Sequence, residues 1–302
     1  MTTNLSILHF LPTKLSGSVC MPKGSTKIRS LKSTLSFLKG NHHVNHSGIY
    51  DLGPDYFKQL ITNKEIRIYF QPIVDLKEKC FFAMEALARG PKNSTFSEKS
   101  PFTIIDEKNH EKLDLVCLEN ITTQIKTLHS FDEINGKNPL YFVNCLPQNI
   151  DFLRKLPMQD ELRKRVVVEL DINHRFFDVD LLLKRIRHLK NDLFQLALDD
   201  IGETNIDFDL IKLINPDYMK IDISLVKDIS KNADIYYKTK KIVDQIRRME
   251  KPIIAEGVEN IDDLKVIAGL GCRYIQGFFF SKPVEMLPQT KEELTTIIKK
   301  AA

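Results

Sequence analysis

The sequence predicts a parallel α/β fold, in the form of an eight-stranded βα barrel that follows a basic N-terminal arm. Short apolar runs recur along the chain and are typical of strands buried on both faces of a sheet. Segments with helical spacing of apolar residues lie between these runs. Polar residues close most of the runs, and βα barrels carry their functional residues at the carboxyl ends of their strands.

The expected strands end in residues with carboxylate, amide or ammonium side chains. In chain order they are 84–89, 141–144, 166–169, 196–200, 218–222 and 253–259. Their polar residues are Glu85, Asn144, Glu169, Asp199, Asp200, Lys220, Asp222, Glu256 and Glu259. Intervals such as Asn144 to Glu169 have room for one helix and two loops. A regular alternation of this kind indicates parallel strands whose polar ends meet at one rim.

The expected helices are Glu111–Leu128, Asp178–Lys190, Ala233–Met249 and Ile261–Leu270. Asn260 followed by Asp263, and Thr290 followed by Glu293, are typical of helix N-termini. A doubly wound open sheet is the alternative architecture. No glycine-rich dinucleotide-binding fingerprint follows any strand, which favours the barrel.

The polar strand ends predict a metal site. Together Glu85, Asn144, Glu169 and Asp199 offer only hard oxygen ligands, which suit Mg²⁺, Mn²⁺ or Ca²⁺ rather than zinc or copper. With Asp200 next in the chain, one carboxylate could bridge two ions, as in two-metal sites whose ions lie about 3.5–4 Å apart.

The same strand ends offer candidates for proton and charge transfer. Lys220 could neutralise phosphate charge or orient a water molecule, and Glu256 is the best candidate to accept a proton from that water. Structural alternatives stay open: a carboxylate at a strand end can cap a helix, and Lys220 could form an ion pair with Asp222. Arg89 could pair with a barrel carboxylate. Glu259 could orient a neighbour or cap a helix, and it ranks below Glu256.

In their order along the chain, these residues resemble the EAL-domain family of cyclic dimeric GMP phosphodiesterases, from about Arg67 to Pro283. The matching landmarks are Gln71-Pro72-Ile73-Val74, Glu85-Ala86-Leu87 with Arg89, Asn144, Glu169, Asp199-Asp200, Lys220-Ile221-Asp222, Ala255-Glu256-Gly257-Val258-Glu259, and Gln276-Gly277 before Ser281-Lys282-Pro283. The resemblance implies a TIM-like (β/α)8 barrel of the EAL type in residues 61–298, after an extension in residues 1–60.

The resemblance also implies an activity, which is metal-dependent hydrolysis of cyclic di-GMP to linear pGpG in bacterial second-messenger signalling. It implies two Mg²⁺ or Mn²⁺ ions as cofactors and in-line attack of water on phosphorus. Gln71, Arg89 and Gln276 align with positions near the ligand, and Asp222 and Glu259 with supporting positions around the site. Family members commonly dimerise through the barrel, so the resemblance implies a homodimer as a partner.

Two departures from the family pattern bear on turnover. Family members usually follow the aspartate pair with Phe-Gly-x-Gly-Tyr-Ser, whereas Asp200 is followed by Ile201-Gly202-Glu203-Thr204-Asn205-Ile206. The family also has a second Glu three positions after Glu169, which helps to hold this loop, and this chain has Ile172. Either Ile172 packs against Ile201 or Ile206 and leaves the aspartates usable, or the loop no longer orders the second metal.

Three functions therefore remain. The retained ligand positions favour a phosphodiesterase, and the altered loop favours a receptor that binds cyclic di-GMP with little or no turnover. A protein-interaction module without nucleotide binding is disfavoured because Gln71, Arg89 and Gln276 are retained.

Charge is segregated along the 302 residues. Residues 1–50 contain six Lys or Arg and no Asp or Glu, so their net charge is +6. The rest of the chain has a net charge of −2, which gives the chain total of +4. This composition favours a mobile terminus over a nucleic-acid arm, a lipid attachment or a metal site at His42, His43 and His46. No nucleic-acid partner is expected for the barrel.

The sequence predicts a cytoplasmic protein. No apolar segment reaches the about 20 residues that a membrane-spanning helix needs, and no secretory signal is evident. The five cysteines show no paired spacing, and Cys80, Cys117 and Cys145 are expected to be reduced core thiols.

Overall fold

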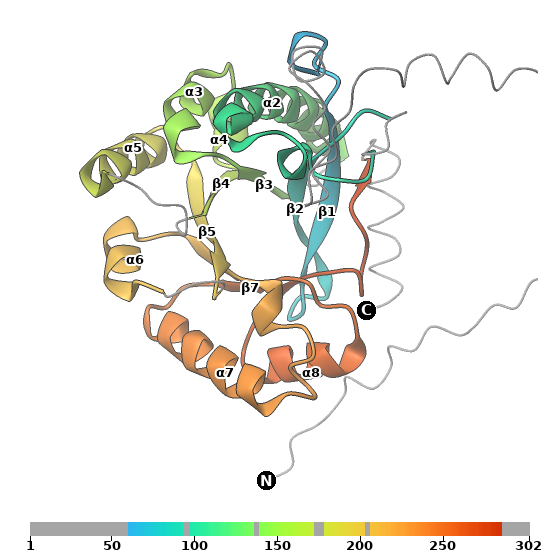
Figure 1. Cartoon of the computed structure of the whole chain (residues 1–302), viewed down its shortest axis with the longest axis vertical. Coiled ribbons are helices and arrows are strands. Elements are labelled where there is room, and N and C mark those ends of the chain that lie inside the picture. The colour runs from blue at the N-terminus through green and yellow to red at the C-terminus, as the bar shows by residue number, and fades with distance from the viewer. Residues whose placement is uncertain (1–59, 93–96, 136–138, 172–177, 203–205, 286–302) are drawn as a thin grey trace, which may run out of the picture.

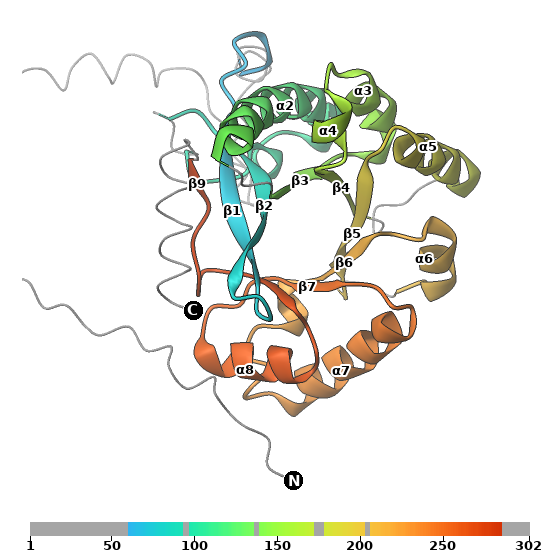
Figure 2. The ribbon, with the colours of Figure 1, turned by 180° about the vertical axis from the view of Figure 1, so that it is seen from behind.

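The chain forms a closed barrel of eight strands surrounded by helices (Figures 1 and 2). A computed structural model describes residues 60–92, 97–135, 139–171, 178–202 and 206–285. Within these residues the strand order is β2-β3-β4-β5-β6-β7-β8-β1, and pairing of β1 with β2 closes the barrel. The predicted barrel is therefore confirmed. The predicted N-terminal arm lies outside the described residues, and the division into residues 1–60 and 61–298 stays a prediction.

The barrel strands are β1 Arg67–Asp75, β2 Cys80–Arg89, β3 Leu140–Asn144, β4 Val166–Asp171, β5 Gln195–Ile201, β6 Tyr218–Ile221, β7 Ile253–Ala255 and β8 Tyr274–Gln276, with a short β9 Val284–Glu285 beside β1. The α-helices are α2 His110–Asn135, α3 Ile150–Lys155, α4 Asp160–Arg163, α5 Val179–Asn191, α6 Phe208–Ile214, α7 Ala233–Arg248 and α8 Ile261–Gly269. Four short 3-10 turns are η1 Pro101–Thr103, η2 Glu107–Asn109, η3 Pro147–Asn149 and η4 Ile223–Leu225.

The barrel differs from a fully parallel sheet at β1. This strand pairs antiparallel with both β2 and β8, whereas neighbouring strands from β2 to β8 are parallel. Only the four-residue turn 76–79 separates β1 from β2. A parallel crossover needs a dozen or more residues, so these two strands can only form a hairpin.

Two apolar layers lie on opposite sides of the barrel wall. The interior cluster includes Ile73, Ala83, Phe142, Val167, Ala197 and Ile254, all fully buried. The larger cluster lies between the strands and the helices, and α2 contributes Leu113 and Leu118 to it. Successive strand residues point alternately to these two layers, so each strand is apolar on both faces.

The predicted helices are present. They correspond to α2, α5, α7 and α8, and α2 continues to Asn135, beyond the expected Leu128. The predicted cap is also present, since Asn260 Oδ1 accepts the backbone N–H of Asp263 at 2.9 Å. Thr290 and Glu293 lie outside the described residues.

The cysteine prediction is correct for Cys117 and Cys145, which are buried, and wrong for Cys80, which is exposed. Cys80 begins β2 directly after the hairpin turn, and the strand becomes buried only from its fourth residue, Ala83. Among the described residues, no helix combines the length and apolar character needed to cross a lipid bilayer.

Candidate active site

Polar side chains fill one end of the barrel interior, because each lies two positions beyond an interior core residue of its own strand. Side chains two apart on a strand share a face. The pairs are Ala83 and Glu85, Phe142 and Asn144, Val167 and Glu169, Ala197 and Asp199, Tyr218 and Lys220, Ile254 and Glu256, and Tyr274 and Gln276. The carboxyl ends of β2 to β8 thus bring together residues that are far apart in the sequence.

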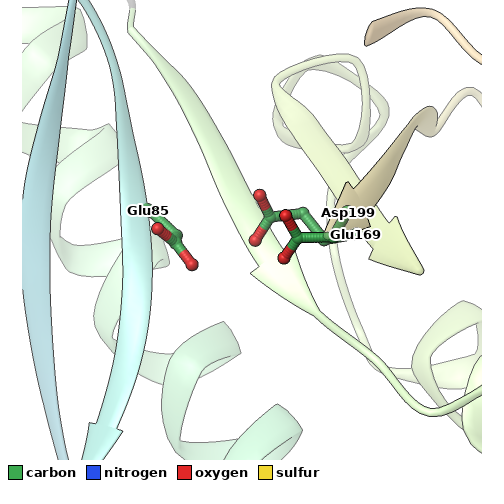
Figure 3. A group of neighbouring side chains, drawn as sticks. All are labelled: Glu85, Glu169 and Asp199. Atoms are coloured by element: carbon green, nitrogen blue, oxygen red, sulfur yellow. The ribbon is translucent and has the colours of Figure 1, made fainter. Parts of the chain in front are cut away.

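Lys220 lies at the centre of this group and is fully buried. Its Nζ lies 2.5 Å from Glu169 Oε1, 2.5 Å from Glu256 Oε1, 3.2 Å from Asp199 Oδ1 and 3.6 Å from Glu85 Oε1. Figure 3 shows Glu85, Glu169 and Asp199 with their carboxylates directed into the space between their strands. The lysine therefore does not form a simple pair with Asp222, which was one structural alternative.

The site carries more negative than positive charge. Burial raises the pKa of Glu169 and of Glu256 well above the ordinary value. Burial alone would lower the pKa of Lys220, but Asp199, Glu169, Glu256 and Glu85 together hold it well above its usual range. Buried carboxylates in this number are costly unless cations or protons offset their charge. The arrangement therefore favours binding of additional cations.

The Asp199-Asp200 pair lies at an irregularity in β5. In a regular strand these neighbours would point to opposite faces, but the β5–β6 register shifts between Leu198 and Ile201, and Asp200 has a φ of 53°. Asp is one of the few residues that tolerate this left-handed conformation. Burial, with Asp199 adding to it, raises the pKa of Asp200 to about 7. The irregularity allows both carboxylates to serve one site.

The acidic residues form two groups that share one member. Glu85, Glu169 and Asp199 can place one oxygen each within 4.8 Å of one another, and so can Asp199, Asp200 and Glu256. The donors are all carboxylate oxygens, which suit hard divalent cations. In number and chemistry these residues fit two neighbouring cations, with Asp199 common to both.

Three amide side chains surround Glu85. Gln276 Nε2 donates to Glu85 Oε2 at 2.5 Å and to Gln71 Oε1 at 3.2 Å, and Asn144 Nδ2 donates to Glu85 Oε1 at 3.1 Å. Gln71 Nε2 donates to the carbonyl of Ser281 at 3.0 Å. Within the described part of the chain, the buried Oε1 of Gln276 accepts no hydrogen bond. The structure thus places Gln71, Asn144 and Gln276 in direct contact with one another or with Glu85.

The remaining predicted residues lie farther out. Arg89 lines a cavity of about 350 Å³ beside Asn144 and Glu169, and its Nη1 donates to the carbonyl of Ala88 at 2.8 Å. Asp222 begins η4 by accepting the backbone N–H of Ser224 at 2.8 Å. Glu259 is exposed just before α8. Of these three, only Arg89 faces the cavity.

The cavity is also lined by residues that the sequence did not single out. Among them are Phe102, His110, Asp114 and Asp171. Asp114 is 3 % exposed and lies on the apolar face of α2 with Leu113 and Cys117. A carboxylate within a helical apolar stripe was the signal that could have identified it.

The described start of the altered loop is held by β6, η4 and α7. Ile201 is buried and pairs with Ile221, while Gly202 has a φ of 112° and leaves no room for a Cβ beside Leu225. The Lys238 ammonium donates to the carbonyl of Gly202 at 3.0 Å. The predicted packing of Ile172 lies outside the described residues, as do residues 203–205.

Gly277→Ala is expected to lower the free energy of unfolding by about 3 kcal/mol, the upper end of the cost of overpacking. A Cβ at Gly277 would overlap the backbone oxygen and nitrogen of Val258, which cannot move aside as a side chain can. Gly269→Ala is the matched control, because nothing lies within 4 Å of its Cβ position, and it should stay within about 1 kcal/mol of the parent. Urea unfolding measures both, and equal midpoints would contradict the prediction.

The fold and the site define a βα-barrel protein with an acidic centre at the carboxyl ends of its strands, whose carboxylates could hold metal ions. The EAL domain model matches residues 55–283, and the chain belongs to the EAL domain family. The family resemblance noted from the sequence is thereby confirmed.

The relatives agree with this assignment. The chain is 24% identical over 288 residues to the probable cyclic di-GMP phosphodiesterase PdeD of Escherichia coli, a match that covers 92% of this chain and 50% of PdeD. The chain thus spans about half the length of this relative. An EAL domain protein from Listeria monocytogenes has the same fold, with a TM-score of 0.66 and 17% identity over 80% of this chain and 98% of that one.

A further solved relative is Klebsiella pneumoniae BlrP1 in a calcium and cyclic di-GMP complex. It has a TM-score of 0.59 and 23% identity, covering 73% of this chain and 56% of BlrP1.

Proposed function

We propose that the protein is a metal-dependent phosphodiesterase that hydrolyses cyclic di-GMP to linear pGpG in bacterial second-messenger signalling. The observation that carries this proposal is the pair of acidic groups sharing Asp199. Sites with two neighbouring cations catalyse in-line displacement at phosphorus by stabilising the attacking and leaving oxygens. The names of PdeD and of the BlrP1 complex support cyclic di-GMP as the ligand.

The ion-binding residues are taken from the two acidic groups, with Asn144 added beside Glu85 and Glu256 kept for proton transfer. Glu85, Asn144, Glu169 and Asp199 would hold one Mg²⁺ or Mn²⁺ ion, and Asp199 and Asp200 would hold the second. When bound, the ions would stabilise the negative charge that develops on the phosphoryl oxygens. The calcium in the BlrP1 complex supports a divalent ion in this family.

Glu256 is assigned as the residue that accepts the proton of the attacking water. Burial raises the pKa of Glu256, and a carboxylate of higher pKa is the stronger proton acceptor when it is ionised. Lys220, 2.5 Å from Glu256 Oε1, holds this carboxylate in place and would supply positive charge to the site where the phosphate reacts. The water oxygen forms a bond to phosphorus while the bond from phosphorus to the ribose 3′ oxygen breaks, and the leaving 3′ oxygen takes up a proton from solvent water.

The other predicted residues position the ligand or the site. Gln71, Arg89 and Gln276 are assigned to ligand contact, in keeping with the cavity beside Arg89 and with the Gln276 Oε1, which accepts no hydrogen bond from the described residues. Asp222 and Glu259 are assigned supporting roles outside the reacting groups. A homodimer through the barrel stays a prediction.

The second candidate function is a cyclic di-GMP receptor without turnover. The sequence after Asp200 favours it, since this loop departs from the family pattern. The described anchors of Gly202 on Leu225 and Lys238 favour the enzyme instead, because they hold the backbone next to Asp200.

The test follows product and binding in the same samples. The purified 302-residue chain is incubated with cyclic di-GMP in Mg²⁺, in Mn²⁺ and with a chelator, and pGpG formation and ligand binding are measured together. Product that needs the metal is the expected result. Binding of cyclic di-GMP without pGpG formation would favour the receptor over the enzyme. If neither binding nor product is found, both functions are rejected.

A further inference from the structure

Asp114 joins helix α2 to the turn that follows β3. Its Oδ2 accepts the backbone N–H of Leu146 at 3.0 Å and the side-chain Nδ2 of Asn149 at 2.8 Å. The same Nδ2 donates to the carbonyl of Glu111 at 2.9 Å, so α2 holds η3 at both ends, at Leu146 just before it and at Asn149, its last residue. Without Asp114, the backbone N–H of Leu146 and the side-chain amide of Asn149 would lose a buried hydrogen-bond acceptor, which costs free energy. The contact therefore stabilises this turn.

This turn carries Asn144. The next residue, Cys145, donates its backbone N–H to the carbonyl of Glu169 at 3.1 Å, and Leu146 then donates to Asp114. The backbone that follows Asn144 is therefore held by β4 on one side and by α2 on the other. Asn144 itself reaches Glu85 at 3.1 Å, so its direction matters to the acidic site.

We propose that Asp114 is a positioning residue, which aims Asn144 at the ion site by fixing the turn 144–146. The inference rests on the proposed role of Asn144 as a metal ligand. Residues that orient metal ligands typically change metal affinity or activity by about 10–100-fold when mutated. Burial raises the pKa of Asp114 to about 6, so at pH 8 its carboxylate is ionised and can accept both hydrogen bonds.

The test is a calorimetric titration of the metal-free 302-residue chain with Mn²⁺ at pH 8. Asp114→Ala should raise the Mn²⁺ dissociation constant by about 10–100-fold. Asp114→Asn keeps an oxygen acceptor and should stay within about threefold of the parent. Rescue by Asn would distinguish orientation of the turn from a need for charge.

Asp263→Ala is the matched control. Asp263 is 2 % exposed and accepts the backbone N–H groups of Asp228 and Ser230 at 3.1 and 2.9 Å, neither of which is an assigned site residue. Its loss removes a comparable backbone cap, so stability should fall, but Mn²⁺ affinity should stay within about threefold of the parent. Equal Mn²⁺ affinities for Asp114→Ala and the parent would overturn the proposal, as would equal losses in both alanine variants.

If Asp114→Ala does not fold, Asn149→Ala decides the matter, since it removes a donor from the same cap. It should raise the dissociation constant by at least about threefold, and parental affinity would overturn the proposal. Hydrolysis by the parent is measured separately. If Asp114→Ala weakens Mn²⁺ binding but the parent does not hydrolyse cyclic di-GMP, the phosphodiesterase is rejected and the positioning role is retained. If the parent hydrolyses cyclic di-GMP but Asp114→Ala binds Mn²⁺ as the parent does, the positioning role is rejected and the phosphodiesterase is retained.

Discussion

Lys220→Met should reduce hydrolysis of cyclic di-GMP by about 10²–10³-fold and lower the free energy of unfolding of the metal-free protein by about 3–5 kcal/mol. The Lys220 ammonium contacts four carboxylates in a fully buried position. Methionine replaces its volume but leaves those carboxylates without this partner. Steady-state kinetics and urea unfolding in chelator measure the two effects.

Divalent ions should restore part of the stability lost in Lys220→Met. A cation that binds the folded protein supplies positive charge to the same carboxylates and stabilises by mass action. Lys241→Met, at an exposed position on α7, is the control and should change stability by no more than about 0.5 kcal/mol. Parental stability and rate in Lys220→Met would show that the lysine is dispensable.

Glu85→Ala should abolish metal-supported hydrolysis, with a loss of at least about 10³-fold, and leave the fold intact. A bound ion contributes several kcal/mol of transition-state stabilisation, and Glu85 is one of its proposed ligands. In the metal-free protein the change removes one of the four carboxylates around the Lys220 ammonium. The repulsion among the carboxylates then falls, and this gain offsets the loss of the hydrogen bonds from Gln276 and Asn144. We expect unfolding midpoints close to those of the parent.

Two comparisons make the Glu85 result specific. Glu161→Ala removes an exposed carboxylate from α4 and should keep the parental rate. Calorimetry should find weaker Mn²⁺ binding in Glu85→Ala than in Glu161→Ala. Parental hydrolysis in Glu85→Ala would mean that the site has been assigned to the wrong residues.

Much of this site could be predicted from the sequence because its signals are local. Glu85, Glu169, Asp199 and Lys220 each lie within or at the end of an apolar run, and side chains two apart on a strand share a face. The short interval between the β1 and β2 runs could also have indicated a hairpin, since it has no room for a helix.

Other features depend on contacts between distant segments. The presence of both Asp199 and Asp200 in one site contradicts regular strand alternation, and it arises from the register shift against β6 and the left-handed Asp200. Asp114 reaches Leu146 only because α2 packs against the turn after β3. No local sequence pattern indicates the register shift at Asp199 and Asp200 or the contact between Asp114 and Leu146.

The sequence by itself determined the strands β2 to β7, the main helices and the identity of the acidic residues, because apolar periodicity and strand ends are properties of neighbouring residues. Tertiary structure decided which of these residues meet. Closure of the barrel brings four carboxylates from β2, β4, β5 and the end of β7 around Lys220 of β6. Electrostatic interactions act through space and strengthen with burial, so the charge balance of this site exists only in the closed barrel.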